Sequence, residues 1–190
     1  MKLRYFIFLV ASAILTATPL SAQQLPEVDE RMLREMCLRG ECRFDVVTRV
    51  RLADGQTQEE RIPQYRPAIL PNSLSIMLGE ELQAVADFDN NVFRRWRAPE
   101  RRESSRNAVL DFKLAQTGDG SIALEVRNNG REPIKLNLFI RAPGAMAGEY
   151  TSSCPVIAGG SVFEYWSRPV AELIVGEAVL VTDAGALQCN

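Results

Sequence analysis

Six arginines crowd one short segment in the middle of the chain, and the last of them is Arg106. Guanidinium groups match the geometry of carboxylates and phosphates, and an indole ring adds a surface for stacking or cation–π contact. This composition predicts a binding site for an anionic ligand or an acidic partner. The candidate residues are Arg94, Arg95, Trp96, Arg97, Arg101 and Arg102. The alternative is a solvated connection whose arginines pair with Glu100, Glu103 and other acids of the protein.

The chain of 190 residues contains no histidine. This excludes a Ser-His-Asp triad, a Cys-His dyad, imidazole metal sites and a histidine pH switch, because each requires an imidazole nitrogen. A Ser-Lys pair is the remaining route to a serine nucleophile. Beyond residue 22 the only lysines are Lys113 and Lys135, both predicted on the polar faces of strands. Glycine-rich nucleotide loops and the G-x-S-x-G motif are absent from the sequence. We therefore expect no enzymatic activity and no cofactor.

Oxygen ligands recur at alternate positions in Asp87-Phe-Asp-Asn-Asn91, as in the first half of a calcium-binding loop. A complete loop of the EF-hand type needs glycine at its sixth position and an acid at its twelfth, where this chain has Val92 and Ala98. We therefore predict no metal site here. The asparagines instead favour a turn at the end of a strand.

A second aromatic segment, Phe163-Glu-Tyr-Trp166, has the composition of a carbohydrate-stacking platform. Strand alternation places Phe163 and Tyr165 on one face and Trp166 on the other. Because aromatic residues are common in the cores of β-sandwiches, we expect Phe163 and Tyr165 to be buried. The position of Trp166 stays open.

The elements that must position these residues are almost all strands, because apolar and polar residues alternate with period two along most of the chain. The predicted strands are 43–52, 56–62, 73–77, 82–88, 109–114, 122–127, 134–140, 162–166, 170–175 and 179–181. Turn residues at Asp54-Gly55, Gly79-Glu80 and Asn128-Asn-Gly130 predict hairpins between successive strands. Only 28–36 has helical period. The predicted fold is all-β, a single antiparallel β-sandwich with one short N-terminal helix.

The segment Leu124-Glu-Val-Arg-Asn-Asn-Gly-Arg-Glu-Pro-Ile134 carries a family resemblance. A strand ending in Asn-Asn-Gly, followed by proline and an alternating apolar strand, resembles the hairpins of immunoglobulin-like sandwich modules in exported bacterial proteins. With Tyr65-Arg-Pro67, Leu78-Gly-Glu80 and Ser153-Cys-Pro155, the chain is similar to small exported bacterial proteins without an assigned function. The resemblance implies an immunoglobulin-like fold and an exported location, and it carries no catalytic residue across.

The N-terminus has the pattern of a secretory signal peptide. Its apolar run, 6–15, is shorter than the roughly 20 residues that span a bilayer, and cleavage is expected near Ala22. Residues 1–22 are thus a predicted signal peptide and 23–190 a single disulfide-stabilised domain. The leader carries two basic residues and no acid, so its removal moves the formal net charge from -2 to -4, which argues against nucleic-acid binding. We expect a soluble periplasmic or secreted protein without a transmembrane anchor.

Four cysteines lie beyond the leader: Cys37, Cys42, Cys154 and Cys189. An even number in an oxidising compartment favours two disulfides. Of the three possible pairings, we favour Cys37–Cys42, which closes a tight turn, and Cys154–Cys189, which holds the C-terminal tail. A redox-active site is disfavoured, because active dithiols use the shorter C-x-x-C spacing.

Together these features predict a non-enzymatic binding or protein-interaction module that engages an anionic envelope ligand or an acidic partner through the arginine-rich segment. Such a module should show an exposed basic surface. Two alternatives stay open. A small histidine-independent hydrolase of an envelope polymer needs two or more carboxylates in a concave pocket. A structural envelope subunit would associate through a polar edge such as 56–62.

Overall fold

A computed structural model of the protein describes residues 42–62, 66–100 and 107–183. All regular secondary structure in these ranges is β-strand. The strands are β1 (Cys42–Arg43), β2 (Val46–Arg51), β3 (Thr57–Ile62), β4 (Arg66–Pro67), β5 (Ile69–Leu70), β6 (Ser73–Met77), β7 (Glu81–Asp89), β8 (Val92–Arg97), β9 (Ala108–Gln116), β10 (Ile122–Asn128), β11 (Ile134–Arg141), β12 (Glu149–Thr151), β13 (Ser161–Trp166) and β14 (Glu172–Leu180). The helix predicted at 28–36 lies outside the described residues. This part of the chain contains no helix that could span a membrane.

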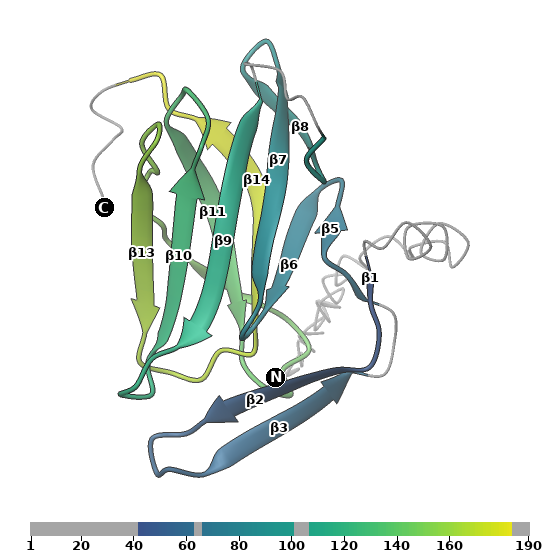
Figure 1. The fold of residues 1–190 in the computed structure, drawn as a ribbon, viewed down its shortest axis with the longest axis vertical. Helices are drawn as coiled ribbons and strands as arrows, with labels where there is room; N and C mark the ends of the chain where they lie inside the picture. Colours follow the sequence, from purple (N-terminus) through teal and green to yellow (C-terminus); the bar gives the residue numbers. More distant parts are fainter. Residues whose placement is uncertain (1–41, 63–65, 101–106, 184–190) are drawn as a thin grey trace, which may run out of the picture.

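Ten of these strands form two five-stranded sheets that pack face to face (Figure 1). The first sheet has the order β13-β10-β9-β7-β8 and the second the order β12-β11-β14-β6-β5, and every pairing is antiparallel. One apolar core draws on both, with Leu110 and Leu124 from the first sheet and Leu136 and Leu173 from the second. The all-β sandwich predicted from the sequence is therefore confirmed.

Burial follows the predicted alternation closely in the middle of the first sheet. Side chains of a strand point alternately to its two faces, and in β9 and β10 the even-numbered residues point into the core. These buried residues are Ala108, Leu110, Phe112, Leu114, Ile122, Leu124, Val126 and Asn128. The odd-numbered residues of both strands therefore form part of a solvent-facing surface.

Within the described ranges five connections are hairpins, which join β2–β3, β5–β6, β7–β8, β9–β10 and β11–β12. Three of them turn tightly through residues of positive φ. Asp54-Gly55 joins β2 to β3 as predicted, with Gly55 at φ 82°. The turn between β9 and β10 places Gly120 at φ 93°, and the turn between β7 and β8 places Asn90 and Asn91 at φ 50° and 64°. Glycine and asparagine adopt this left-handed backbone most readily, which is why these turns reverse the chain so tightly.

Two predicted hairpins are wrong. The turns at Gly79-Glu80 and Asn128-Asn-Gly130 carry the chain from one sheet to the other, so β6 does not pair with β7, nor β10 with β11. Asn128 is fully buried, and its amide donates to the carbonyls of Glu132 and Val156 at 2.8 and 3.1 Å. The asparagine thus stabilises a connection between the two sheets, because its side chain satisfies buried backbone groups. The preference of asparagine for turns does not by itself show whether the turn is a hairpin or such a crossover.

The strands also differ from prediction at several places. Four of them, β4, β5, β8 and β12, were not predicted, and β8 replaces the connection expected at the arginine-rich segment. Segment 43–52 is divided at Asp45, whose φ of 55° separates β1 from β2. Segments 170–175 and 179–181 instead belong to one strand, β14, whose pairing with β11 contains a register shift. The polar ribbon of β2 and β3 lies across the lower end of the sandwich in Figure 1. It buries Val50 and Thr48 and leaves Arg49 and Glu59 in solvent.

Candidate functional site

The solvent-facing side of the first sheet, here called the outer face, gathers polar and aromatic side chains from all five strands. In Figure 1 this sheet lies in front of the second. Strand register sets two central rows across β13, β10, β9 and β7, which are Phe163-Glu125-Lys113-Glu81 and Ser161-Arg127-Asp111-Gln83. Because the pleat holds neighbours of a row on one side of the sheet, these residues share a single surface.

A groove of about 390 Å³ runs over this surface. Its lining residues are Glu81, Leu82, Gln83, Asp111, Phe112, Lys113, Glu125 and Arg127. The side chains include carboxylates, which accept hydrogen bonds, and amide, ammonium and guanidinium groups, which donate them. The groove therefore offers both kinds of partner to a polar ligand. Sequence reasoning missed this site, because its residues come from three strands and share no motif.

Ion pairs and hydrogen bonds already link the charged groups of the groove. Lys113 Nζ donates to Glu81 at 2.6 Å, and Gln83 donates to Asp111 at 2.6 Å. The hydrogen bond and the charge of Glu81, with the charge of Glu125, raise the pKa of Lys113 above its usual value. This lysine therefore stays protonated and acts as a hydrogen-bond donor rather than as a base or nucleophile.

Two exposed aromatic rings stand on the edge strand β13 beside the groove. Phe163 is 52% and Tyr165 is 64% exposed, so the prediction that both lie in the core is wrong. The inward positions of β13 belong to Val162, Glu164 and Trp166, and Trp166 is half-buried against the core. Both faces of this strand carry aromatic residues, so alternation alone did not determine which face is buried.

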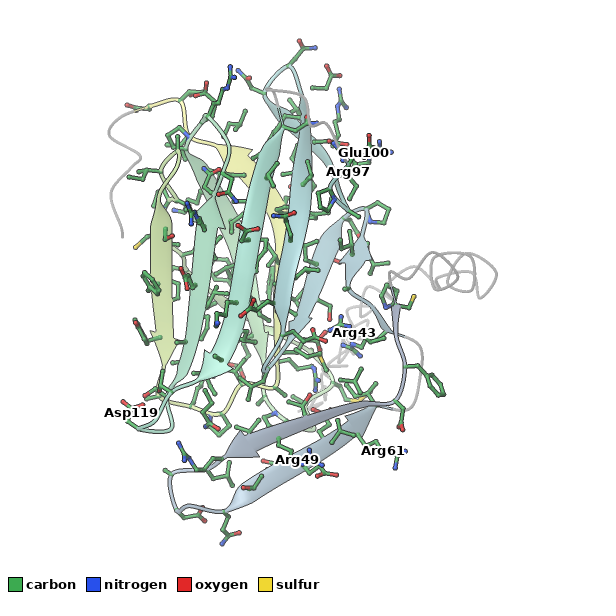
Figure 2. The ribbon with its side chains drawn as sticks, in the orientation of Figure 1. Arg43, Arg49, Arg61, Arg97, Glu100 and Asp119 are labelled. Carbon is green, nitrogen blue, oxygen red and sulfur yellow. The ribbon has the colours of Figure 1, made fainter. Side chains whose placement is uncertain are left out.

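The arginines predicted to bind a ligand lie on β8, at the opposite edge of the same sheet. Arg95 and Arg97 both bind Asp87 at 3.0 Å, and Arg94 binds Asp89 at 2.6 Å. Figure 2 labels Arg97 beside Glu100, with which it pairs at 3.6 Å. The described arginines thus pair with the protein's own acids, as the alternative expected, but they lie on a strand rather than in a connection. Arg101 and Arg102 lie outside the described residues.

Trp96 does not share the solvent exposure of its neighbours. It is 2% exposed, packs against Phe93 and Phe112, and donates its indole N–H to the Gly176 carbonyl at 2.7 Å. In this fold its ring is not available for stacking on a ligand. The part of the predicted site that faces solvent therefore consists of arginines.

The half-match to a calcium loop is the hairpin turn between β7 and β8. Asp87 and Asp89 bind arginines, while Asn90 and Asn91 occupy the turn itself. Among the described residues, no three histidine, cysteine or acidic side chains cluster as metal ligands would.

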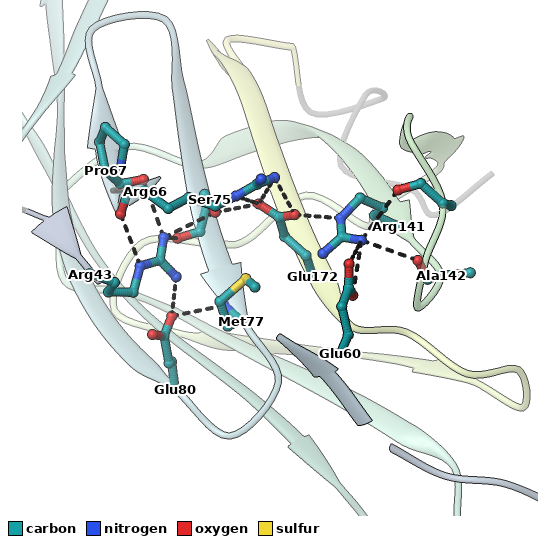
Figure 3. A network of polar contacts seen from close by, with 11 residues as sticks. Arg43, Glu60, Arg66, Pro67, Ser75, Met77, Glu80, Arg141, Ala142 and Glu172 are labelled. Carbon is teal, nitrogen blue, oxygen red and sulfur yellow. Dashed lines mark hydrogen bonds and ion pairs between the residues drawn. The ribbon is translucent and has the colours of Figure 1, made fainter. Parts of the chain in front are cut away.

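A largely buried ionic network joins the second sheet to the β2–β3 ribbon (Figure 3). At its centre Glu172 of β14 is fully buried and accepts hydrogen bonds from Ser75, from Arg66 at 2.6 Å and from Arg141 at 2.6 Å. Arg141 also binds Glu60 of β3 at 2.8 Å. The network thereby connects β3, β4, β6, β11 and β14.

Arg43 extends the same network to β1 and to the start of β7. Its guanidinium binds Glu80 and the backbone oxygen of Ser75. Burial lowers the pKa of Arg43, while the charges of Glu80 and Glu172 oppose that effect. We assign this cluster to stability rather than ligand binding, because its charged groups point toward one another.

Stability should fall in acid because of Glu172. Burial opposes ionisation of this carboxyl, but hydrogen bonds from Ser75 and Arg141 and the charge of Arg66 outweigh it and lower its pKa below the ordinary value. Its contribution is therefore fully present above the pKa of the unfolded chain and is lost as pH falls through the folded-state pKa. We expect the urea midpoint to fall progressively as the pH is lowered below about 5. In Glu172→Gln this fall should be shallower, and an unchanged slope would contradict the assignment.

Only two of the four cysteines lie in the described residues. Cys42 and Cys154 are described, and neither is a free cysteine. Cys37 and Cys189 lie outside the described residues, so the pairing Cys37–Cys42 and Cys154–Cys189 stays a prediction.

Comparisons with protein-family models, with curated proteins and with solved structures gave no match to this chain. A fold of this kind supports many activities, so the functional argument depends on the outer face and its chemistry.

Proposed function

We propose that this protein is an exported, non-enzymatic binding module that recognises its ligand through the outer face of the sheet β13-β10-β9-β7-β8. The observation that carries the proposal is the juxtaposition of a polar groove of about 390 Å³ with two exposed rings, Phe163 and Tyr165. Concave surfaces with a few convergent polar groups and apolar contacts are typical of ligand sites. The groove lies on rigid strands, which hold its side chains in fixed register.

The compartment and the finer fold type belong to the same proposal. A signal peptide at 1–22, two disulfides, a short N-terminal helix and an immunoglobulin-like topology fit a small exported module. Support comes from the leader pattern, from the four cysteines and from the two packed antiparallel sheets. The periplasm or the extracellular space is the proposed location.

A hydrolase is the second candidate, because such an enzyme needs two or more carboxylates in a concave pocket and the groove provides them. Glu81, Asp111 and Glu125 bring three carboxylates to one concave surface. A glycoside hydrolase needs one carboxyl kept protonated by apolar surroundings, whereas Glu81 is 69% exposed and Asp111 accepts hydrogen bonds from Gln83 and Asn129. Neither carboxyl therefore has the apolar surroundings that a catalytic acid needs, so we rank binding first. Release of reducing ends from an envelope polymer, abolished in Glu125→Gln, would establish the hydrolase instead.

Co-sedimentation with isolated envelope fractions tests the binding proposal. The mature protein is mixed with purified membranes and with the insoluble glycan polymer of its exporting cell, and the bound fraction is measured. We expect retention on at least one fraction, reduced at least about tenfold in the double variant Phe163→Ala/Tyr165→Ala, because interface energy concentrates in aromatic anchors. The control is Tyr150→Ala, which removes a ring that is 61% exposed on the other sheet.

The arginine-rich segment is the rival site in the same assay. Loss of retention only in the triple variant Arg94→Ala/Arg95→Ala/Arg97→Ala would move the site to the β8 edge and restore the anionic-ligand prediction. Equal retention by the parent and by both multiple variants would reject the outer face altogether.

A further inference from the structure

Acids and bases balance on the outer face. Among the described residues that register or an ion pair places there, the acids are Glu81, Asp87, Asp89, Asp111 and Glu125, and the bases are Arg94, Arg95, Arg97, Lys113 and Arg127. An anionic ligand would therefore meet as many repelling as attracting groups. Charge complementarity usually determines which partner a surface accepts, and here it favours an uncharged ligand.

One of the two exposed rings, Tyr165, has small neighbours on the adjoining strands. Tyr165 stands opposite Ala123 of β10, and Ala123 stands opposite Ala115 of β9. Methyl side chains do not reach over a neighbouring ring, which agrees with the 64% exposure of Tyr165. Flat, rigid rings provide a large apolar contact with little loss of conformational entropy, and the C–H faces of sugar rings fit such contacts.

We infer that the ligand of the outer face is an uncharged glycan, an inference that rests on the proposed function. Sugar hydroxyls both donate and accept hydrogen bonds, and the row that begins at Phe163 continues with an acceptor, Glu125, and a donor, Lys113. The distance from β13 to β7 is three strand spacings, roughly 14 Å. A short oligosaccharide lying across the strands would stack on β13 and bond its hydroxyls over β10, β9 and β7.

Affinity electrophoresis of the mature protein tests this ligand class. Gels contain one soluble uncharged polysaccharide each, namely a β-glucan, a xylan, a galactomannan or a soluble chitin derivative, and matched gels contain the anionic polymers alginate or polygalacturonate. We expect retardation by an uncharged polymer, roughly tenfold weaker in Tyr165→Ala and in Phe163→Ala. Tyr150→Ala should migrate as the parent does. Thermal unfolding of each variant confirms that it is folded.

The outcomes separate this inference from the proposed function. Retardation only by anionic polymers, or binding only to vesicles of anionic phospholipid or to an extended peptide, would overturn the glycan inference. The proposed function would still stand if such binding weakened in the Phe163 and Tyr165 variants. Glycan binding that both variants retain in full would overturn the inference and the outer-face site together. If the protein bound none of these probes, both the glycan inference and the proposed function would be rejected.

Discussion

Replacing Glu172 with alanine should lower the free energy of unfolding by about 3–5 kcal/mol, the usual cost of removing one partner from a buried ion pair. The carboxylate is fully buried and accepts hydrogen bonds from Arg66, Arg141 and Ser75. Its loss leaves Arg141, itself buried, with Glu60 as its remaining ionic partner. Urea unfolding followed by tryptophan fluorescence measures the change.

An exposed ion pair with the same nitrogen–oxygen distance provides the control. Glu149 binds Arg168 at 2.6 Å, as Glu172 binds Arg66, but the Glu149 side chain is 69% exposed. Glu149→Ala should change stability by less than about 1 kcal/mol, since solvent already screens both charges. Equal losses in the two variants would show that burial does not determine the strength of the Glu172 network.

Replacing Trp96 with alanine should also destabilise the protein by about 3–5 kcal/mol. The indole ring packs in the core, and its N–H bonds Gly176 of the opposite sheet, so the variant leaves a cavity and an unpaired carbonyl. Trp96→Phe keeps most of the apolar volume and should cost less. Thermal and urea unfolding report both changes.

The neighbouring arginine supplies the comparison. Arg95→Ala removes an exposed side chain and should change stability by less than about 1 kcal/mol. A stable Trp96→Ala protein that had lost ligand binding would show that Trp96 contacts the ligand, contrary to its position in the core. Comparing the two variants thus separates the structural tryptophan from the charged groups beside it in sequence.

The two aromatic segments exchange the positions expected for them. From the sequence, Trp96 was expected to face a ligand and Phe163 and Tyr165 to face the core, whereas the structure buries Trp96 and exposes the other two. Alternation reveals the period of a strand but not which face is inward when both faces carry large apolar residues. Pairing with distant strands makes that choice, as Trp96 pairs with Ala86 and Phe163 with Glu125.

The sequence by itself determined the all-β class, most of the longer strands, the tight turns at Asp54-Gly55 and Asn90-Asn91, and the alternation that builds the core. These properties depend on local backbone preferences and on side-chain period. Only the tertiary structure decided that the turns after β6 and β10 cross between sheets, and that Glu125, Lys113 and Glu81 form one row. A turn residue specifies how sharply the chain reverses but not which strand it then pairs with, because that pairing depends on contacts far apart in sequence.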